Sequence, residues 1–141
     1  MNADLPTLQA FFASAPFMAD LGVVPTAAEP GRVTTVLDVA PRHRQHTGVT
    51  HAGVLVSMAD HTMGAAAQTL APEGHWILTA ELKSSLLRGV PTDRLECQAW
   101  VLKPGRMLSF TEAEVHAVAP DGTRTLVMKA SATMAVVPAE R

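Results

Sequence analysis

The sequence has 141 residues, of which 48% are hydrophobic and 17% charged, and its formal net charge is −2. Such a composition is typical of one globular domain with a substantial core and excludes a largely disordered chain. The basic residues are scattered, which excludes a concentrated basic surface for nucleic acid or an anionic membrane. No run of about 18 uncharged apolar residues is present, so no membrane-spanning helix is predicted.

Cys97 is the only cysteine, so no internal disulfide can form and a reducing compartment is favoured. The N-terminus has no basic region of the kind that opens a signal peptide, and two aspartates bracket its apolar part. We therefore expect a cytoplasmic protein that forms a single domain over residues 1–141.

The first 22 residues predict an N-terminal helical segment, because apolar side chains recur at helical spacing after Pro6, a residue suited to a first turn. Residues 31–40 alternate between apolar and polar side chains, which predicts a strand. Residues 41–50 are polar and contain proline and glycine, which predicts a loop.

A long helix is expected from Thr50 or His51 to about Leu70, closed by a proline and a glycine. It is apolar almost all round, which indicates that it is covered on all sides. Four strand-like segments follow, separated by turn signals: residues 75–87, 93–103, 106–119 and 123–137. This order predicts an α+β layer structure, in which a four-stranded meander covers part of the helix and another subunit covers the rest.

Asp60 lies in the middle of this apolar helix. A buried carboxylate is costly unless it is paired or hydrogen-bonded. A local salt bridge or an exposed position would explain it structurally, and a catalytic role would explain it functionally.

The start of the same helix favours the catalytic role. The stretch from His51 to Gly53 places the backbone N–H groups of Ala52 and Gly53 in the first turn, where they lack intrahelical partners. Such a turn can hold a carbonyl oxygen or an oxyanion. Ala52 and Asp60 are eight residues apart, or roughly 12 Å along one helix, so one chain cannot present both groups to one carbonyl. Two antiparallel copies related by a two-fold axis can, which predicts a dimer with two shared sites.

These residues resemble a motif of the hotdog-fold acyl-CoA thioesterases, specifically their phenylacetic-acid-pathway-like branch. The motif is a polar residue, a glycine and an "HGG" helix start with an acid seven residues later, and here it reads Gln45, Gly48, "HAG" from His51 and Asp60. The stretches "LTAELKSSLLRGV" and "AWVLKPGRMLSFTEAEV" resemble the family's second strand and following hairpin. The resemblance extends from residue 32 to residue 137.

The resemblance implies a hotdog fold, with an antiparallel sheet wrapped round one long helix, and dimers or tetramers that act on acyl-CoA. It implies that Asp60 is the general base or the nucleophile and that the Ala52 N–H polarises the thioester carbonyl. Gln45 and His51 would orient the thioester or the water, and Thr79 would assist the water. The substrate would be a small or medium acyl- or aryl-CoA, with no metal and no cofactor beyond the coenzyme A of the substrate.

Two residues depart from the family pattern. Ala52 replaces the usual first glycine, which keeps the N–H but adds a methyl group, and Gln45 stands where many members have asparagine. Both bear on acyl preference. Arg88 and Arg106 lie at turns and, given the resemblance, are candidates to bind the phosphates of coenzyme A.

Other readings of the polar residues are weaker. The loop histidines have no cysteine beside them, so a zinc site is not favoured. Ser57 is not in a nucleophile elbow, and His61 points about 100° away from Asp60 on a helix. A non-catalytic acyl-CoA-binding module remains the alternative function. A hydratase is weaker, because its usual pairing of Asp and His is not found.

Overall fold

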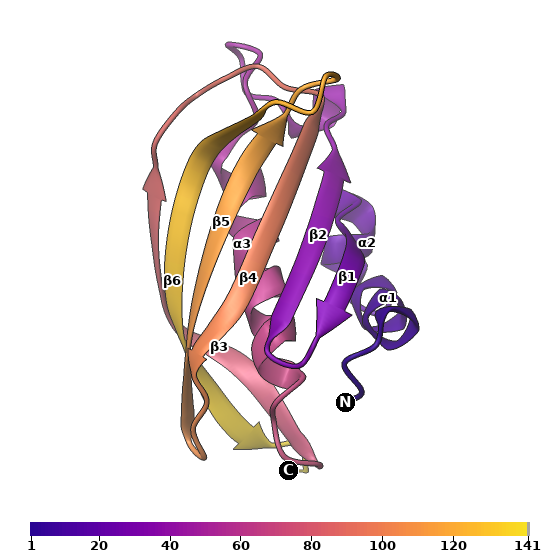
Figure 1. Cartoon of the computed structure of the whole chain (residues 1–141), viewed down its shortest axis with the longest axis vertical. Helices are drawn as coiled ribbons and strands as arrows, with labels where there is room; N and C mark the ends of the chain where they lie inside the picture. Colours follow the sequence, from indigo (N-terminus) through magenta and orange to yellow (C-terminus); the bar gives the residue numbers. More distant parts are fainter. Residues whose placement is uncertain (141) are drawn as a thin grey trace.

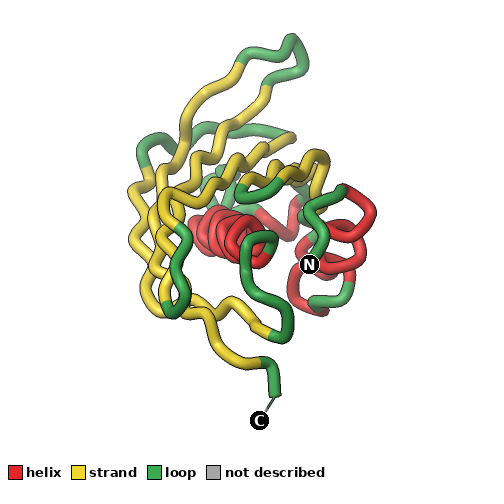
Figure 2. Tube along the Cα trace, turned by 60° about the horizontal axis from the view of Figure 1, so that its bottom comes forward, coloured by secondary structure: helices red, strands yellow, loops and turns green. Residues whose placement is uncertain are grey.

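The computed structural model describes residues 1–140 and shows one antiparallel sheet curved around a long helix (Figure 1). Seen from below, the sheet wraps the long helix on one side, while two short helices lie beside it (Figure 2). The helices are α1 Leu5–Ala13, α2 Pro16–Leu21 and α3 Ala52–Gln68, with a single 3-10 turn at Pro41–His43. The strands are β1 Val24–Glu29, β2 Arg32–Asp38, β3 His75–Leu86, β4 Arg94–Lys103, β5 Leu108–Val118 and β6 Arg124–Pro138. This confirms the α+β hotdog architecture predicted from the sequence.

The six strands lie in the order β1-β2-β4-β5-β6-β3, so the prediction of a four-stranded meander was wrong. Strands β4, β5 and β6 do form hairpins in sequence order, but β3 pairs with β6 and is an edge strand. The segment between β3 and β4 crosses from this edge to the middle of the sheet (Figure 1). Turn residues mark where a strand ends, whereas its neighbour is chosen by how the sheet closes around the helix.

The N-terminal segment contains two helices where the sequence predicted one helical segment. The break precedes Pro16, which has no backbone N–H and keeps Ala15 in an extended conformation (φ −92°, ψ 106°). Strand β1 was not predicted, because Pro25 and a register shift between Pro25 and Ala27 disturb its alternation.

Helix α3 packs its sheet-facing side against the core, where Met58, Ala59 and Met63 have no exposed surface. Its other side is only partly covered, and this open stripe includes Gly53, Ser57 and Asp60. The helix is therefore not covered on all sides within one chain.

Among residues 1–140, none of the helices combines the length and the apolar character needed to span a bilayer.

Cys97 packs in the core as a small apolar residue. It is completely buried on β4, and burial raises the pKa of its thiol to about 12. The thiol is therefore protonated at neutral pH and has no nucleophilic role.

Candidate active site

Within residues 1–140, the N–H of Ala52 is a free backbone donor at the start of α3. His51 is the N-cap residue, and its Nδ1 accepts a 2.8 Å hydrogen bond from the N–H of Gly53. The N–H of Ala52, by contrast, makes no hydrogen bond with any of residues 1–140. Ala52 is exposed at the positive end of the helix dipole. Of the two N–H groups proposed from the sequence, Ala52 is therefore the one open to a ligand, while Gly53 serves the cap.

A tight turn holds Gln45 beside this helix start. The N–H of Gln45 donates to Val49 O at 2.9 Å, and the N–H of Gly48 donates to Gln45 O at 2.9 Å. Gly48 has a φ of +90°, a backbone conformation that favours glycine. The side chain of Arg44 closes the turn by donating to Gly48 O at 3.0 Å. The glycine of the motif thus shapes the loop that carries Gln45.

His43 anchors the same loop to the N-terminal segment. Its Nδ1 accepts a 2.9 Å hydrogen bond from the Ala40 N–H, so its Nε2 carries the proton and donates to Leu21 O at 2.7 Å. His43 is buried, and residues 1–140 contain no group of three or more metal-ligating side chains. This loop histidine has a structural role, and both of its ring nitrogens are occupied.

A cavity of about 220 Å³ lies at the helix start. Gln45, Ala52 and Arg88 line it together with apolar side chains of α3, β3 and β4. A free N–H at a helix start, in a mainly apolar cavity, is suited to a carbonyl oxygen that gains negative charge during a reaction.

Asp60 lies against β3. Its Oδ1 accepts a 2.7 Å hydrogen bond from the hydroxyl of Thr79, and the same hydroxyl lies 3.5 Å from the sulfur of Met134. The register of β3 against β6 shifts between Thr79 and Glu81, and such irregularities often redirect side chains near functional sites. Asp60 is half-buried and is satisfied by this hydroxyl, not by the salt bridge that offered a structural explanation.

A second cavity, of about 180 Å³, lies beside Asp60 and Thr79 and shares no lining residue with the first. The two cavities lie at separate places along α3, in keeping with the eight residues between Ala52 and Asp60. One chain therefore carries two separate candidate half-sites, a free backbone N–H at Ala52 and the carboxylate of Asp60, that do not face a common point.

His61 does not form a dyad with Asp60. Its ring stacks on Phe11 of α1 with centroids 5.5 Å apart and meets Phe12 edge-on at 4.6 Å. Burial lowers the pKa of His61, which the nearby Asp60 offsets in part. The contact with Phe11 was not anticipated from the sequence, since no local pattern indicates that α1 packs on this part of α3.

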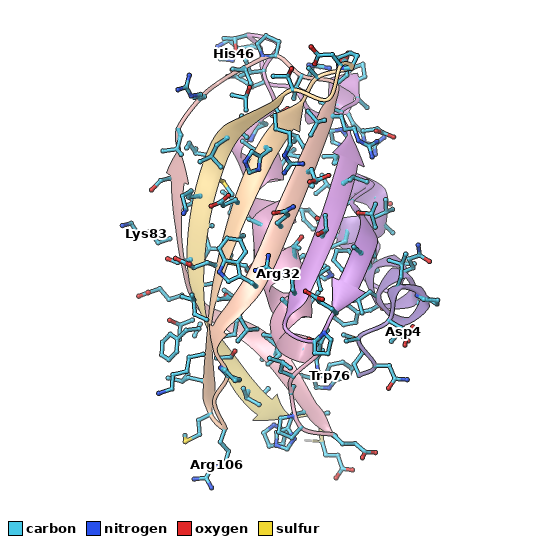
Figure 3. The ribbon with its side chains drawn as sticks, viewed as in Figure 1. Asp4, Arg32, His46, Trp76, Lys83 and Arg106 are labelled. Carbon is cyan, nitrogen blue, oxygen red and sulfur yellow. The ribbon has the colours of Figure 1, made fainter. Side chains whose placement is uncertain are left out.

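The two candidate arginines lie far apart within one chain. Arg88 lines the cavity at the helix start, whereas Arg106 lies in the β4–β5 turn at the opposite end of the sheet from the loop that carries His46 (Figure 3).

Ser57 donates from its hydroxyl to Gly53 O at 2.7 Å, a bond within the helix that gives it no catalytic contact.

The chain is similar to known proteins in both sequence and structure. A model of the thioesterase superfamily matches residues 47–121. A crystal structure of a thioesterase family protein from Silicibacter pomeroyi is 31% identical, with a TM-score of 0.88 over 93% of this chain and 96% of that one. A thioesterase from Haemophilus influenzae is 20% identical, with a TM-score of 0.87 over 100% and 95% of the two chains. A mutant thioesterase from Pseudomonas aeruginosa is 24% identical, with a TM-score of 0.84 over 98% and 96%. No curated protein gives a significant match.

Proposed function

We propose, from the premise that this chain belongs to the thioesterase superfamily, that it hydrolyses an acyl-CoA thioester to a free acid and coenzyme A. The superfamily match, over residues 47–121, includes both Ala52 and Asp60. Membership supports thioester hydrolysis in general. The acyl-CoA substrate, the residue roles and the phenylacetic-acid-pathway-like branch are our proposal.

The proposal rests on the hydrogen bonding of the two half-sites. The Ala52 N–H has no partner within residues 1–140, and Asp60 Oδ1 is occupied by the Thr79 hydroxyl. Because that hydroxyl holds Oδ1, Oδ2 is the oxygen left to accept a proton. Thr79 thus orients the carboxylate toward its target.

In the proposed reaction, Asp60 Oδ2 removes a proton from water as the water oxygen attacks the thioester carbonyl carbon. The carbonyl oxygen becomes an oxyanion, which the Ala52 N–H stabilises. The tetrahedral intermediate collapses and its C–S bond breaks, so coenzyme A leaves as a thiolate and takes the proton held by Asp60. Direct attack by the carboxylate, followed by hydrolysis of an anhydride, would use the same residues.

Gln45 and His51 complete the helix-start half of the site. Gln45 lines the cavity beside Ala52, where its amide can orient the thioester. His51 acts through its cap on Gly53, which fixes the first turn and so the direction of the neighbouring Ala52 N–H. We propose His51 as a positioning residue.

A homodimer would bring the two half-sites together. Strand β3 is an edge strand, and its apolar residues Trp76, Leu78 and Leu86 are about half exposed. An exposed apolar edge is a site for pairing with another strand. Antiparallel pairing of β3 with β3 of a second copy would run the two α3 helices in opposite directions, so that each helix start faces the partner's Asp60. A tetramer built from two such dimers remains a prediction.

Coenzyme A would bind beside the helix start. Arg88 lines that cavity and is exposed, so it is placed to contact a phosphate. Arg106 lies at the other end of the sheet and would reach the same coenzyme A only from the partner subunit.

Mixing two inactive variants tests the shared site. Ala52→Pro removes only the proposed oxyanion donor, because proline is well accepted at the first helical position and His51 (φ −61°, ψ 138°) already has the conformation required before proline. Asp60→Asn removes the base. Each variant alone should show little thiol release from acyl-CoA.

After the two variants are unfolded and refolded together, about half of the dimers should be mixed and hold one intact site each, which restores about a quarter of wild-type activity. Refolding Asp60→Asn alone and Ala52→Pro alone is the control. Dimeric mixtures that stay inactive would contradict the shared site. A wild-type protein that binds acyl-CoA without hydrolysing it would support the non-catalytic binding module.

A further inference from the structure

The cavity beside Asp60 has a polar side and an apolar side. Asp60 and Thr79 supply the polar groups, and Phe11 and Ile77 are apolar residues that line it. Gly64 also lines it, and a side chain added there would meet no atom within 4 Å. The cavity is therefore open along one turn of α3, next to the group proposed to carry out the chemistry.

Phe11 comes from α1, an element outside the matched residues 47–121. It is half-buried, and its ring lies on His61 with an interplanar angle of 19°. Phe12, which is 2% exposed, supports His61 from a second direction at an angle of 82°. This aromatic cluster fixes the position of Phe11 relative to the helix that carries Asp60.

The position of His61 in this cluster leaves one of its ring nitrogens without a hydrogen bond in the described part of the chain. Its Nε2 is buried and has no hydrogen-bond partner in residues 1–140, which is unfavourable for a polar group. Burial lowers the pKa of His61, so the ring is neutral at neutral pH and packs as a flat aromatic surface behind Phe11.

We infer that Phe11 is a specificity-determining residue that closes the acyl-binding cavity, so that the N-terminal helix limits the size of the acyl group. The inference rests on the proposed function. The cavity has a volume of about 180 Å³, and Phe11 is the residue through which α1 lines it. A long acyl chain that extended from Asp60 toward α1 would meet the ring of Phe11, whereas a short acyl group would not reach beyond it.

The experiment compares kcat/KM across acetyl-, butyryl-, hexanoyl-, octanoyl-, dodecanoyl-, benzoyl- and phenylacetyl-CoA for four proteins. These are the wild type, Phe11→Ala, Phe11→Leu and a control, Phe17→Ala. Phe17 is 64% exposed on α2 and does not line the cavity. Circular dichroism establishes that each variant is folded.

Phe11→Ala should raise kcat/KM for the chains just longer than the wild-type optimum, relative to acetyl-CoA, by at least about tenfold, since one methylene in an apolar pocket changes selectivity on that scale. Phe11→Leu should shift the profile less in the same direction, and it decides the question if Phe11→Ala does not fold. Phe17→Ala should leave the profile unchanged. Equal changes for every substrate would overturn the role of Phe11.

The same panel separates this inference from the proposed function. If the wild type hydrolyses none of the thioesters, the proposed function fails. The dissociation constants of the panel, measured by calorimetry for the same four proteins, then test Phe11. A chain-length shift in affinity confined to the Phe11 variants would support the cavity wall, and an unchanged order of affinities would overturn it.

Discussion

The hydroxyl of Thr79 donates a 2.7 Å hydrogen bond to Oδ1 of Asp60 and so ties the middle of α3 to the edge strand β3. The two residues are 19 positions apart in the sequence. This bond satisfies one oxygen of a half-buried carboxylate and leaves the other free.

Asp60→Asn should lower kcat by at least about a hundredfold, because general-base catalysis typically contributes 10² to 10⁴. The amide keeps the shape of the side chain and its acceptor for Thr79, so substrate binding should change much less. Thiol release and acyl-CoA titration measure the two quantities. A folded variant with near wild-type turnover would exclude Asp60 as base or nucleophile.

Thr79 supports Asp60 and is expected to be less critical. Thr79→Val removes the hydroxyl at nearly constant volume and should lower kcat, whereas Thr79→Ser keeps the hydrogen bond to Asp60 and should retain most of the activity. Measuring kcat of the two variants side by side provides the matched control. If kcat falls as much in Thr79→Ser as in Thr79→Val, the hydroxyl of Thr79 does not contribute to catalysis.

Ala52→Pro should lower kcat by about 10² to 10³, the usual cost of losing one oxyanion donor. Ala52→Gly keeps the N–H, so it should remain active. Circular dichroism checks that the helix still forms. A proline variant with normal kcat would place the oxyanion elsewhere.

Gln45→Ala should reduce kcat/KM less than the loss of Asp60, by no more than about 3–4 kcal/mol of transition-state stabilisation. Gln45→Asn keeps a side-chain amide and should retain more activity than Gln45→Ala. Steady-state kinetics for the two variants test this order. A reversed order would argue against an orienting role for the amide.

His51→Ala should destabilise the protein by about 1 kcal/mol, because it removes the side-chain cap on the Gly53 N–H. His51→Asn supplies another good N-cap residue and should recover most of that stability. Urea denaturation measures both changes. Equal stability of the alanine variant and the wild type would show that the cap contributes nothing.

The stability of the protein should fall as the pH is lowered below about 6.5, in part because of His61. Burial lowers the pKa of His61 in the folded protein, so between the unfolded and the folded pKa the unfolded chain binds the extra proton. Stability therefore rises with pH across that range. His61→Phe keeps an aromatic ring beside Phe11 and removes the titration.

The measurement for His61 is the unfolding temperature between pH 5 and pH 8. The loss of stability toward acid should be smaller in His61→Phe than in the wild type. His46→Phe changes an exposed loop histidine and serves as the control. Identical pH profiles for His61→Phe and the wild type would exclude a contribution from His61.

Much of the fold was predictable because its signals are local. The period of apolar residues located α3, β2 and the four later strands to within a few residues, since each period reflects the geometry of one element. Strand β1 escaped prediction because Pro25 and the register shift beside it remove the alternation. The motif from Gln45 to Asp60 likewise lies in one stretch of chain, so the candidate residues were accessible to sequence reasoning.

Tertiary structure decided the rest. The way in which the whole sheet closes around α3 pairs β3 with β6 and not with β4. It also brings Thr79 of β3 to Asp60 of α3. The packing of α1 and α2 against the sheet and α3 places Phe11 on His61. The amino-acid sequence by itself determined most of the helices and strands, β1 excepted, and where the chemistry-bearing residues stand. Which of these residues touch was settled only by long-range packing, because such contacts join segments whose local patterns carry no information about one another.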